Sequence, residues 1–382
     1  MPSRLASYHL PIGYMLFFVL PDDNTPRGGG KQSYRQVQVL CEAGIDACAL
    51  HSARGFRYTW FPNDVPIAYA PCPARKRFSA MASKVAARWV PPPDLAMDAG
   101  RKVYIEKGGK HYKHIISRDD LVIFPEYHGG LLEGAVTRVP VAVFNQNPHN
   151  GFRHTVYPGD TAAAFEPIYA ASNFAGVVTV SEYAEDCLKW TFPGVDVHRV
   201  ICGVDSSVFH PREPRVERSL AYMPRKLASH VQNALCMLRS RGALDGWTIS
   251  PISGMSESRV AGVLRKSAIF LCTSSEEGFG LPPVEAAMCG CLVVGYAGQA
   301  GYEFMDPKYC TPVPQDDVYS LAQSLEAAMH NVVTNSSSVR ARTHEFAEIL
   351  ARRYSVDAEK ASVIAAWTKV VSSADRIRKA GV

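Results

Sequence analysis

The chain has 382 residues, of which 47% are hydrophobic and 20% charged, and its formal net charge is +5. This balance is that of a globular protein with enough chain for about two domains, and it excludes a disordered, collagen-like or coiled-coil chain. The longest strongly apolar run, residues 14–20, falls far short of the roughly 20 residues that a membrane-spanning helix needs. No signal-peptide cleavage site follows it, so we interpret it as a buried first strand.

Strand-like and helix-like apolar patterns alternate along the chain, which is typical of parallel sheets covered by helices. In the first half, the patterns predict strands at 15–20, 47–51, 121–125, 139–145 and 177–181, and helices at 32–43 and 182–190. In the second half, they predict strands at 219–223, 247–252, 268–272 and 292–295, and helices at 228–241, 256–266, 283–289, 316–330, 338–353 and 357–371. The two blocks predict an α/β protein with two Rossmann-like domains, 1–203 and 204–382, and a site at the carboxyl ends of the strands, in the cleft between the domains.

The ten cysteines are scattered through the chain, and no Cys-x-x-Cys motif occurs. This usage predicts reduced, packed thiols in a cytoplasmic protein instead of a disulfide framework. Metal-like spacings occur at Cys289 and Cys291 and at His111 and His114, but neither pair has a second pair nearby. We therefore expect no metal site.

Residues 75–118 carry 11 Lys and Arg against three acidic residues, a local charge of +8. Such a block favours anionic partners, namely phospholipid headgroups, a phosphorylated acceptor or nucleic acid. The triple proline at 91–93 and the glycine pair at 108–109 fit a solvated surface loop equally well. Nucleic acid is the weakest of these partners, although aromatic residues interleave the block at Phe78, Trp89, Tyr104 and Tyr112.

The stretch 274–294 carries the most informative motif. It reads as a strand end, a loop with two glycines, and a helix opened by Pro283 with Glu285 in its first turn. Loop glycines let backbone N–H groups approach a ligand, and a helix start favours phosphate. Glu277, at the loop's mouth, and Glu285 could accept hydrogen bonds from sugar hydroxyls beside that phosphate. A capped helix with two acidic residues near its N-terminus is the alternative for this pattern taken alone.

This stretch resembles the Glu-x7-Glu region of the retaining nucleotide-sugar glycosyltransferases of family 4, which have the GT-B fold. The core at 277–286, Glu-Gly-Phe-Gly-Leu-Pro-Pro-x-Glu-Ala, matches residue by residue. Residues 178–182 and 200–211 are similar to the family's strand, helix and interdomain linker, with the signature Gly-Val-Asp-x-x-x-Phe-x-Pro at 203–211. The resemblance spans about residues 15 to 355 and is weakest between 52 and 118.

The resemblance implies a role for each matching residue in the donor site. Glu285 would hold the ribose hydroxyls of the nucleotide, and Glu277 would contact hydroxyls of the transferred sugar. Arg225 and Lys226 would neutralise the diphosphate leaving group, although the family usually separates these two residues along the chain. Backbone amides near the sugar and phosphates would come from Gly278, Phe279, Gly280 and Leu281, and a glycine-rich loop facing the diphosphate from Gly28, Gly29 and Gly30.

Residues 145–147, Asn-Gln-Asn, follow a predicted strand where many members of the family carry a histidine. Asn145, Gln146 or Asn147 would then face the donor sugar, with Asn147 as a candidate catalytic residue and Gln146 as an acceptor-side candidate. Neutral amides are poor bases. They fit front-face transfer, in which the leaving phosphate takes the acceptor's proton.

Three further residues stand at predicted strand ends. Glu126 and His128 are candidates for acceptor binding or proton transfer, since histidine titrates near neutrality. A histidine hydrogen-bonded within a turn is the alternative. Glu303 resembles the family's post-strand Gly-x-Glu and is expected to shape the cleft.

The resemblance predicts a retaining, metal-independent enzyme that moves a hexose or deoxyhexose from a nucleotide diphosphate sugar to a glycan or lipid-linked acceptor, without a cofactor. Surface polysaccharide or glycoconjugate synthesis in the cytoplasm would be its setting, with 75–118 as a candidate contact with the inner face of an anionic membrane. The C-terminal helix is expected to return to the first domain.

A nucleotide-sugar-binding protein with impaired catalysis is one alternative to this function, and another GT-B enzyme such as an epimerase or a phosphorylase is a second. The absence of Gly-x-Gly-x-x-Gly argues against a dehydrogenase.

Overall fold

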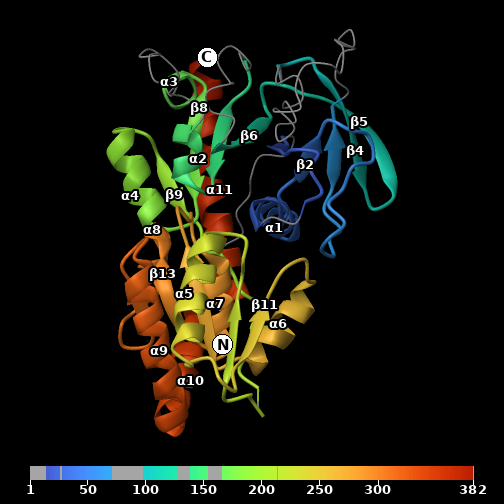
Figure 1. The fold of residues 1–382 in the computed structure, drawn as a ribbon. Helices are drawn as coiled ribbons and strands as arrows, with labels where there is room; N and C mark the ends of the chain where they lie inside the picture. Colours follow the sequence, from blue (N-terminus) through green and yellow to red (C-terminus); the bar gives the residue numbers. More distant parts are fainter. Residues whose placement is uncertain are drawn as a thin grey trace, which may run out of the picture. The chain divides into compact units, whose positions relative to one another are not determined.

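The computed structural model of the chain describes residues 14–25, 28–70, 98–126, 138–153, 166–212 and 214–381. The chain divides into two compact units (Figure 1). The first comprises residues 1–144, 151–178 and 363–382, and the second comprises 145–150 and 179–362. The single boundary predicted between residues 203 and 204 stays a prediction.

The first unit is built on buried parallel strands. Its central strand β1 (Leu16–Val19) pairs in parallel with β2 (Ala47–His51) on one side and β6 (Leu121–Pro125) on the other. Every residue of these three strands is buried, as expected for parallel strands covered on both faces. The sheet has the order β5-β4-β3-β2-β1-β6-β7-β8-β9. The remaining strands of this sheet are β3 (Ile67–Tyr69), β4 (Lys102–Lys107), β5 (Lys110–Ile115), β7 (Val141–Asn145), β8 (Phe174–Thr179) and β9 (Val197–Arg199), of which β9 belongs to the second unit.

Part of the basic segment 75–118 forms an antiparallel hairpin that was not predicted. Strands β4 and β5 pair from Lys102↔Ile115 to Lys107↔Lys110. Gly108 and Gly109 form the two-residue turn with φ of +56° and +71°, a conformation in which glycine is favoured. Only His114 of β5 is not exposed, so its sequence lacks the apolar alternation that marks a strand. Residues 71–97, which hold the rest of the basic segment, lie outside the described residues.

Two helices pack against the strands of the first unit. They are α1 (Gly28–Glu42) and the last part of α11 (Val356–Ala380). The fully buried ring of Trp367 lies 5.0 Å from Phe18 and 6.3 Å from Phe144, measured between centroids. Its indole N–H donates to Gln36 Oε1 at 2.9 Å. The C-terminal segment therefore contributes to the core beside β1 and β7. The shorter helices in the first half of the chain are α2 (Pro148–Arg153), α3 (Glu166–Tyr169) and α4 (Glu182–Thr191), of which α4 belongs to the second unit.

A buried carboxylate ties β5 to the central strands. Asp120, just before β6, is fully buried, and its Oδ2 lies 2.9 Å from His114 Nε2. The same carboxylate accepts the backbone N–H groups of Met15 and Ser117 at 2.9 and 2.8 Å. The hydrogen bond to Asp120 raises the pKa of His114 above its usual value of 6.5.

The His114–Asp120 pair predicts a pH dependence of stability. A histidine whose pKa is raised by folding stabilises the folded state fully below the unfolded pKa of about 6.5, and this stabilisation is lost as pH rises through the folded pKa. We expect the midpoint of thermal unfolding to fall as pH rises above about 6.5, and His114→Asn to flatten that slope. Scanning calorimetry between about pH 5.5 and 8.5 measures it. An identical slope in the variant would assign the effect to other groups.

The second unit contains a five-stranded parallel sheet in the order β11-β10-β12-β13-β14. Its strands are β10 (Ser219–Tyr222), β11 (Thr248–Pro251), β12 (Ile269–Ser274), β13 (Leu292–Ala297) and β14 (Thr311–Val313). Its helices are α5 (Ala228–Ser240), α6 (Glu257–Lys266), α7 (Leu281–Met288), α8 (Gly298–Gly301), α9 (Val318–Thr334) and α10 (Ser336–Arg353). The strands and helices predicted for this half are confirmed to within a few residues, except that the last helix, predicted at 357–371, extends to Ala380. The α/β class is confirmed.

Candidate functional site

The order of the strands in the second sheet indicates where a ligand would bind. The chain moves from β10 outward to β11, and from β12 outward through β13 to β14. Strand order therefore reverses between β10 and β12, and open parallel sheets bind ligands beyond the carboxyl ends of the strands at such a reversal. A small pocket of about 40 Å³ lies there, lined by residues that include Met223, Arg225, Lys226, Ser274, Glu277, Pro282 and Pro283.

Two of the residues that line this pocket form an ion pair. Lys226 Nζ lies 2.6 Å from Glu277 Oε1 and donates to the Ser275 carbonyl at 3.1 Å. The backbone carbonyl of Lys226 accepts from the Thr273 hydroxyl at 3.0 Å, which fixes the chain after β10 to the end of β12. Arg225 is exposed and lines the same pocket. The structure thus brings together Arg225, Lys226 and Glu277, which are two cations and one carboxylate.

The loop that carries Glu277 has an irregular backbone. Glu276 has a φ of +47°, which is uncommon for a residue with a side chain, and Gly280 has a φ of +93°. A Cβ atom on Gly278 would lie 1.6 Å from the backbone oxygen of Gln146, so only glycine fits there. The loop glycines quoted in the motif are therefore required by the local geometry.

Asn147 is joined to this loop. Its Nδ2 donates to the Glu276 carbonyl at 2.6 Å, and its Oδ1 accepts the His149 backbone N–H at 3.1 Å. The second unit thus holds Asn147 and Glu277 on adjoining segments. That Asn147 and Gln146 face a sugar stays a prediction.

Helix α7 begins earlier than expected. It starts at Leu281 instead of 283, because its two prolines fit in the first turn, where backbone N–H groups have no partner in the helix. The first turn holds no acidic residue, so the placement of Glu285 there was wrong. Glu285 lies on the second turn and is half-buried.

The glycines of the first unit are placed differently from expectation, whereas Glu126 lies at a strand end as expected. Gly28 to Gly30 form the first turn of α1 instead of a loop, and a Cβ on Gly30 would lie 2.8 Å from the Tyr58 ring. Close packing against that ring explains a glycine at this position. Glu126 is buried directly after β6, while His128 lies outside the described residues.

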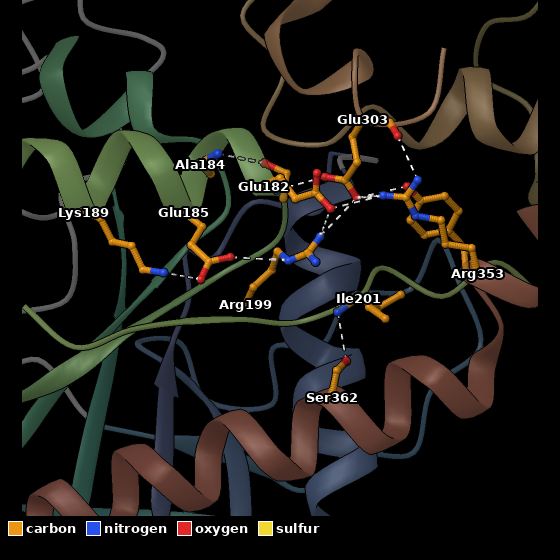
Figure 2. Close-up of polar contacts among 11 residues, drawn as sticks. Glu182, Ala184, Glu185, Lys189, Arg199, Ile201, Glu303, Arg353 and Ser362 are labelled. Carbon is orange, nitrogen blue, oxygen red and sulfur yellow. Dashed lines mark hydrogen bonds and ion pairs between the residues drawn. The ribbon is translucent and has the colours of Figure 1, made fainter. Parts of the chain in front are cut away.

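Glu303 lies in a separate polar cluster, which Figure 2 shows. Its side chain is only 3% exposed and faces Arg199 Nη1 at 3.3 Å and Arg353 Nη2 at 3.5 Å. One of its oxygens accepts the backbone N–H of Glu182 at the start of α4 at 2.9 Å. Two guanidinium groups beside a buried carboxylate offset the cost of burying its charge. The sequence pattern indicated Glu303 as a residue of interest, but it indicated neither Arg199 nor Arg353.

Most of the described cysteines are buried, but Cys236 is exposed. The nine cysteines that the structure describes are free, and burial raises the pKa of Cys272 and of Cys291 to about 11. Across the described residues, no three His, Cys, Asp or Glu side chains come together as a metal site would require. Within the same residues, no helix combines the length and the apolarity needed to cross a bilayer.

One segment of the chain matches a known protein family. Residues 249–344, about a quarter of the chain, match the family model "Glycosyl transferases group 1". A curated relative, an MMP alpha-(1->4)-mannosyltransferase of Mycolicibacterium hassiacum, is 27% identical over 154 residues. That match covers 32% of this chain and 38% of the relative, so it spans well under half of the relative's length.

Solved structures resemble the chain over nearly all of its length. A sucrose-phosphate synthase of Thermosynechococcus elongatus has a TM-score of 0.61 at 13% identity, covering 94% of this chain and 100% of that one. A glycosyltransferase of Rickettsia africae has a TM-score of 0.59 at 12% identity, covering 94% and 99%. An Anabaena protein in complex with UDP and glucose has a TM-score of 0.58 at 12% identity, covering 96% and 99%. The chain therefore has the GT-B fold of glycosyltransferase structures, and its residues 249–344 are similar to the group 1 glycosyl transferases.

Proposed function

We propose that the chain is a cytoplasmic, retaining glycosyltransferase that moves a hexose or deoxyhexose from a nucleotide diphosphate sugar to a glycan or lipid-linked acceptor. The single observation that carries the proposal is the Lys226–Glu277 pair in the pocket where strand order reverses between β10 and β12. It provides a cation for phosphate and a carboxylate for sugar hydroxyls within one site. The mannosyltransferase relative and the Anabaena structure with UDP and glucose support this donor class.

The proposed chemistry divides among these residues. The bond between the sugar's anomeric carbon and the diphosphate oxygen breaks, and negative charge develops on the leaving group. Lys226 and Arg225 would stabilise that charge, which removes the need for a metal ion. Glu277 would hold the sugar hydroxyls, and Glu285 on α7 would hold the ribose. The acceptor hydroxyl attacks from the face that the diphosphate leaves, and its proton passes to the departing phosphate.

Product stereochemistry tests this mechanism. Proton NMR of the glycoside formed from a nucleotide sugar should give the same anomeric configuration as the donor. An inverted product would contradict the retaining mechanism. A glycosyl-enzyme trapped on Asn147 or a neighbouring residue and seen by mass spectrometry would contradict front-face transfer.

A nucleotide-sugar-binding protein without transfer activity is the second candidate. The amides at 145–147 are poor bases, and Arg225 is exposed while Lys226 is paired, so the two cations are not equivalent. Nucleotide binding without consumption of any nucleotide sugar, across a panel of acceptors, would favour this candidate. An epimerase or a phosphorylase would instead consume its substrate without transfer to an added acceptor.

We further propose that the basic segment 75–118 contacts an anionic membrane. In its described part, the β4–β5 hairpin exposes Lys102, Lys110 and Lys113. Liposomes with anionic lipid should sediment the protein at low salt, and the double variant K110E/K113E should weaken this binding. Equal binding to neutral liposomes would contradict the proposal.

A further inference from the structure

A buried aromatic residue anchors the loop 276–280, which carries Glu277 and which we call the donor loop. Phe279, between the two loop glycines, is 5% exposed. Its ring centroid lies 5.7 Å from that of Phe304 and 5.2 Å from that of Tyr354, in tilted and edge-to-face arrangements. Aromatic pairs at these distances contribute beyond simple burial, so this side chain holds the loop to the end of α10.

Tyr354 connects this anchor to the Glu303 cluster. The tyrosine is 1% exposed, and its hydroxyl donates to Glu303 Oε1 at 3.0 Å. Burial, followed by the neighbouring Glu303 carboxylate, raises the pKa of Tyr354 far above its usual value of 10, so the hydroxyl keeps its proton and acts as the donor. Its backbone carbonyl also accepts the N–H of Val204 at 2.8 Å.

Glu303 is itself held from several sides. Its carboxylate accepts the N–H at the start of α4 and faces Arg199 and Arg353, as Figure 2 shows, and its backbone carbonyl accepts from Arg353 Nη1 at 2.9 Å. These partners restrict the position of the Glu303 carboxylate. It can therefore fix the direction of the Tyr354 hydroxyl and of the ring that carries it.

We propose that Glu303 is a positioning residue for the donor loop, acting through the Tyr354 hydroxyl and the Phe279 ring on residues 276–280. Glu303 is not among the residues that line the pocket, so we assign it a positioning role and not a catalytic one. The positioning claim concerns the loop alone, whereas its effect on donor binding rests on the proposed function.

Tyr354→Phe tests this inference because it removes only the hydroxyl and keeps the ring. Tyr309→Phe is a matched control, since the Tyr309 hydroxyl donates to Glu345 Oε1 at 2.6 Å in the same unit, away from the loop. Hydrogen exchange by mass spectrometry should be about three- to tenfold faster in the peptide 276–281 of Tyr354→Phe, as expected for one lost hydrogen bond. The same peptide should be unchanged in Tyr309→Phe, with similar thermal midpoints for both variants.

Glu303→Gln is the second variant. It removes a buried charge that faces Arg199 and Arg353, which keep Glu182 as a second partner, so Glu303→Gln perturbs the whole cluster and not only the Tyr354 hydroxyl. Tyr354→Phe is therefore decisive. Unchanged exchange of 276–281 in that variant, or equal acceleration in Tyr309→Phe, would overturn the inference.

Nucleotide affinity separates this inference from the proposed function. With UDP, GDP, ADP, dTDP and CMP as probes, the dissociation constant of the nucleotide that binds the wild type should rise about three- to tenfold in Tyr354→Phe. If the wild type binds none of them, the proposed donor site fails, while the exchange of residues 276–281 still decides the positioning role.

Discussion

Replacing Lys226 by alanine is expected to lower kcat for sugar transfer by about 10²- to 10³-fold, the effect of removing one preorganised group that faces developing charge. The ammonium group lies in the pocket beside Glu277, at 2.6 Å, where a leaving diphosphate would gather negative charge. The rate of nucleoside diphosphate release at saturating donor and acceptor measures this effect.

Lys308→Ala provides the matched control for that measurement. Lys308 Nζ lies 3.1 Å from Glu345 Oε1 in the same unit, so the variant also removes a lysine–glutamate pair. Its pair is largely exposed and outside the pocket, and kcat should stay within about twofold of the wild type because exposed pairs contribute little. A Lys226→Ala enzyme that keeps more than a third of the wild-type kcat would contradict the assigned role.

Replacing Glu285 by alanine is expected to weaken nucleotide binding by about 10²- to 10⁴-fold. The proposed contact is a carboxylate accepting two ribose hydroxyls, and hydrogen bonds to charged groups contribute about 1.5–3 kcal/mol each. Isothermal titration with the nucleotide that binds the wild type measures the change in dissociation constant.

Glu348→Ala is the control for Glu285→Ala. Glu348 is exposed on α10 in the same unit, where its carboxylate lies 4.0 Å from Arg352. Nucleotide affinity should be unchanged in this variant. If both variants bind the nucleotide as the wild type does, the ribose is held by other groups and the assignment of Glu285 is wrong.

Most of the second sheet could be predicted from sequence because strands such as β12 and β13 are continuous apolar runs between clear helical patterns, whereas β14 was not predicted. Strands β12 and β13, for example, are buried along their whole length and lie where the pattern indicated. The resemblance, and not the strand pattern, indicated Lys226 and Glu277, and the ion pair between them was not predicted, although the regularity of the sheet explains it. Both residues stand directly after neighbouring parallel strands, and the carboxyl ends of such strands meet at one edge of the sheet.

Other features could not be predicted because they depend on polar segments without apolar periodicity or on residues far apart in the sequence. Strand β5 is exposed and polar, so its pairing is set by the Gly108–Gly109 turn and not by a hydrophobic face. The turn that holds Glu285 shifted because prolines are compatible with the first turn of a helix. The partners of Glu303 come from residues 182, 199 and 353, far from it in sequence, and local periodicity carries no information about them.

The most direct test of the central claim, a nucleotide-sugar donor site in the second unit, is a thermal-shift panel of the wild type with UDP, GDP, ADP, dTDP and CMP. A nucleotide present at about 100 times its dissociation constant adds about 2.7 kcal/mol to the free energy of unfolding, which raises the melting temperature by a few degrees. We predict a rise with one base, which then identifies the donor to use in transfer assays. No rise with any nucleotide at millimolar concentration would contradict the donor site and leave the GT-B fold without its proposed substrate.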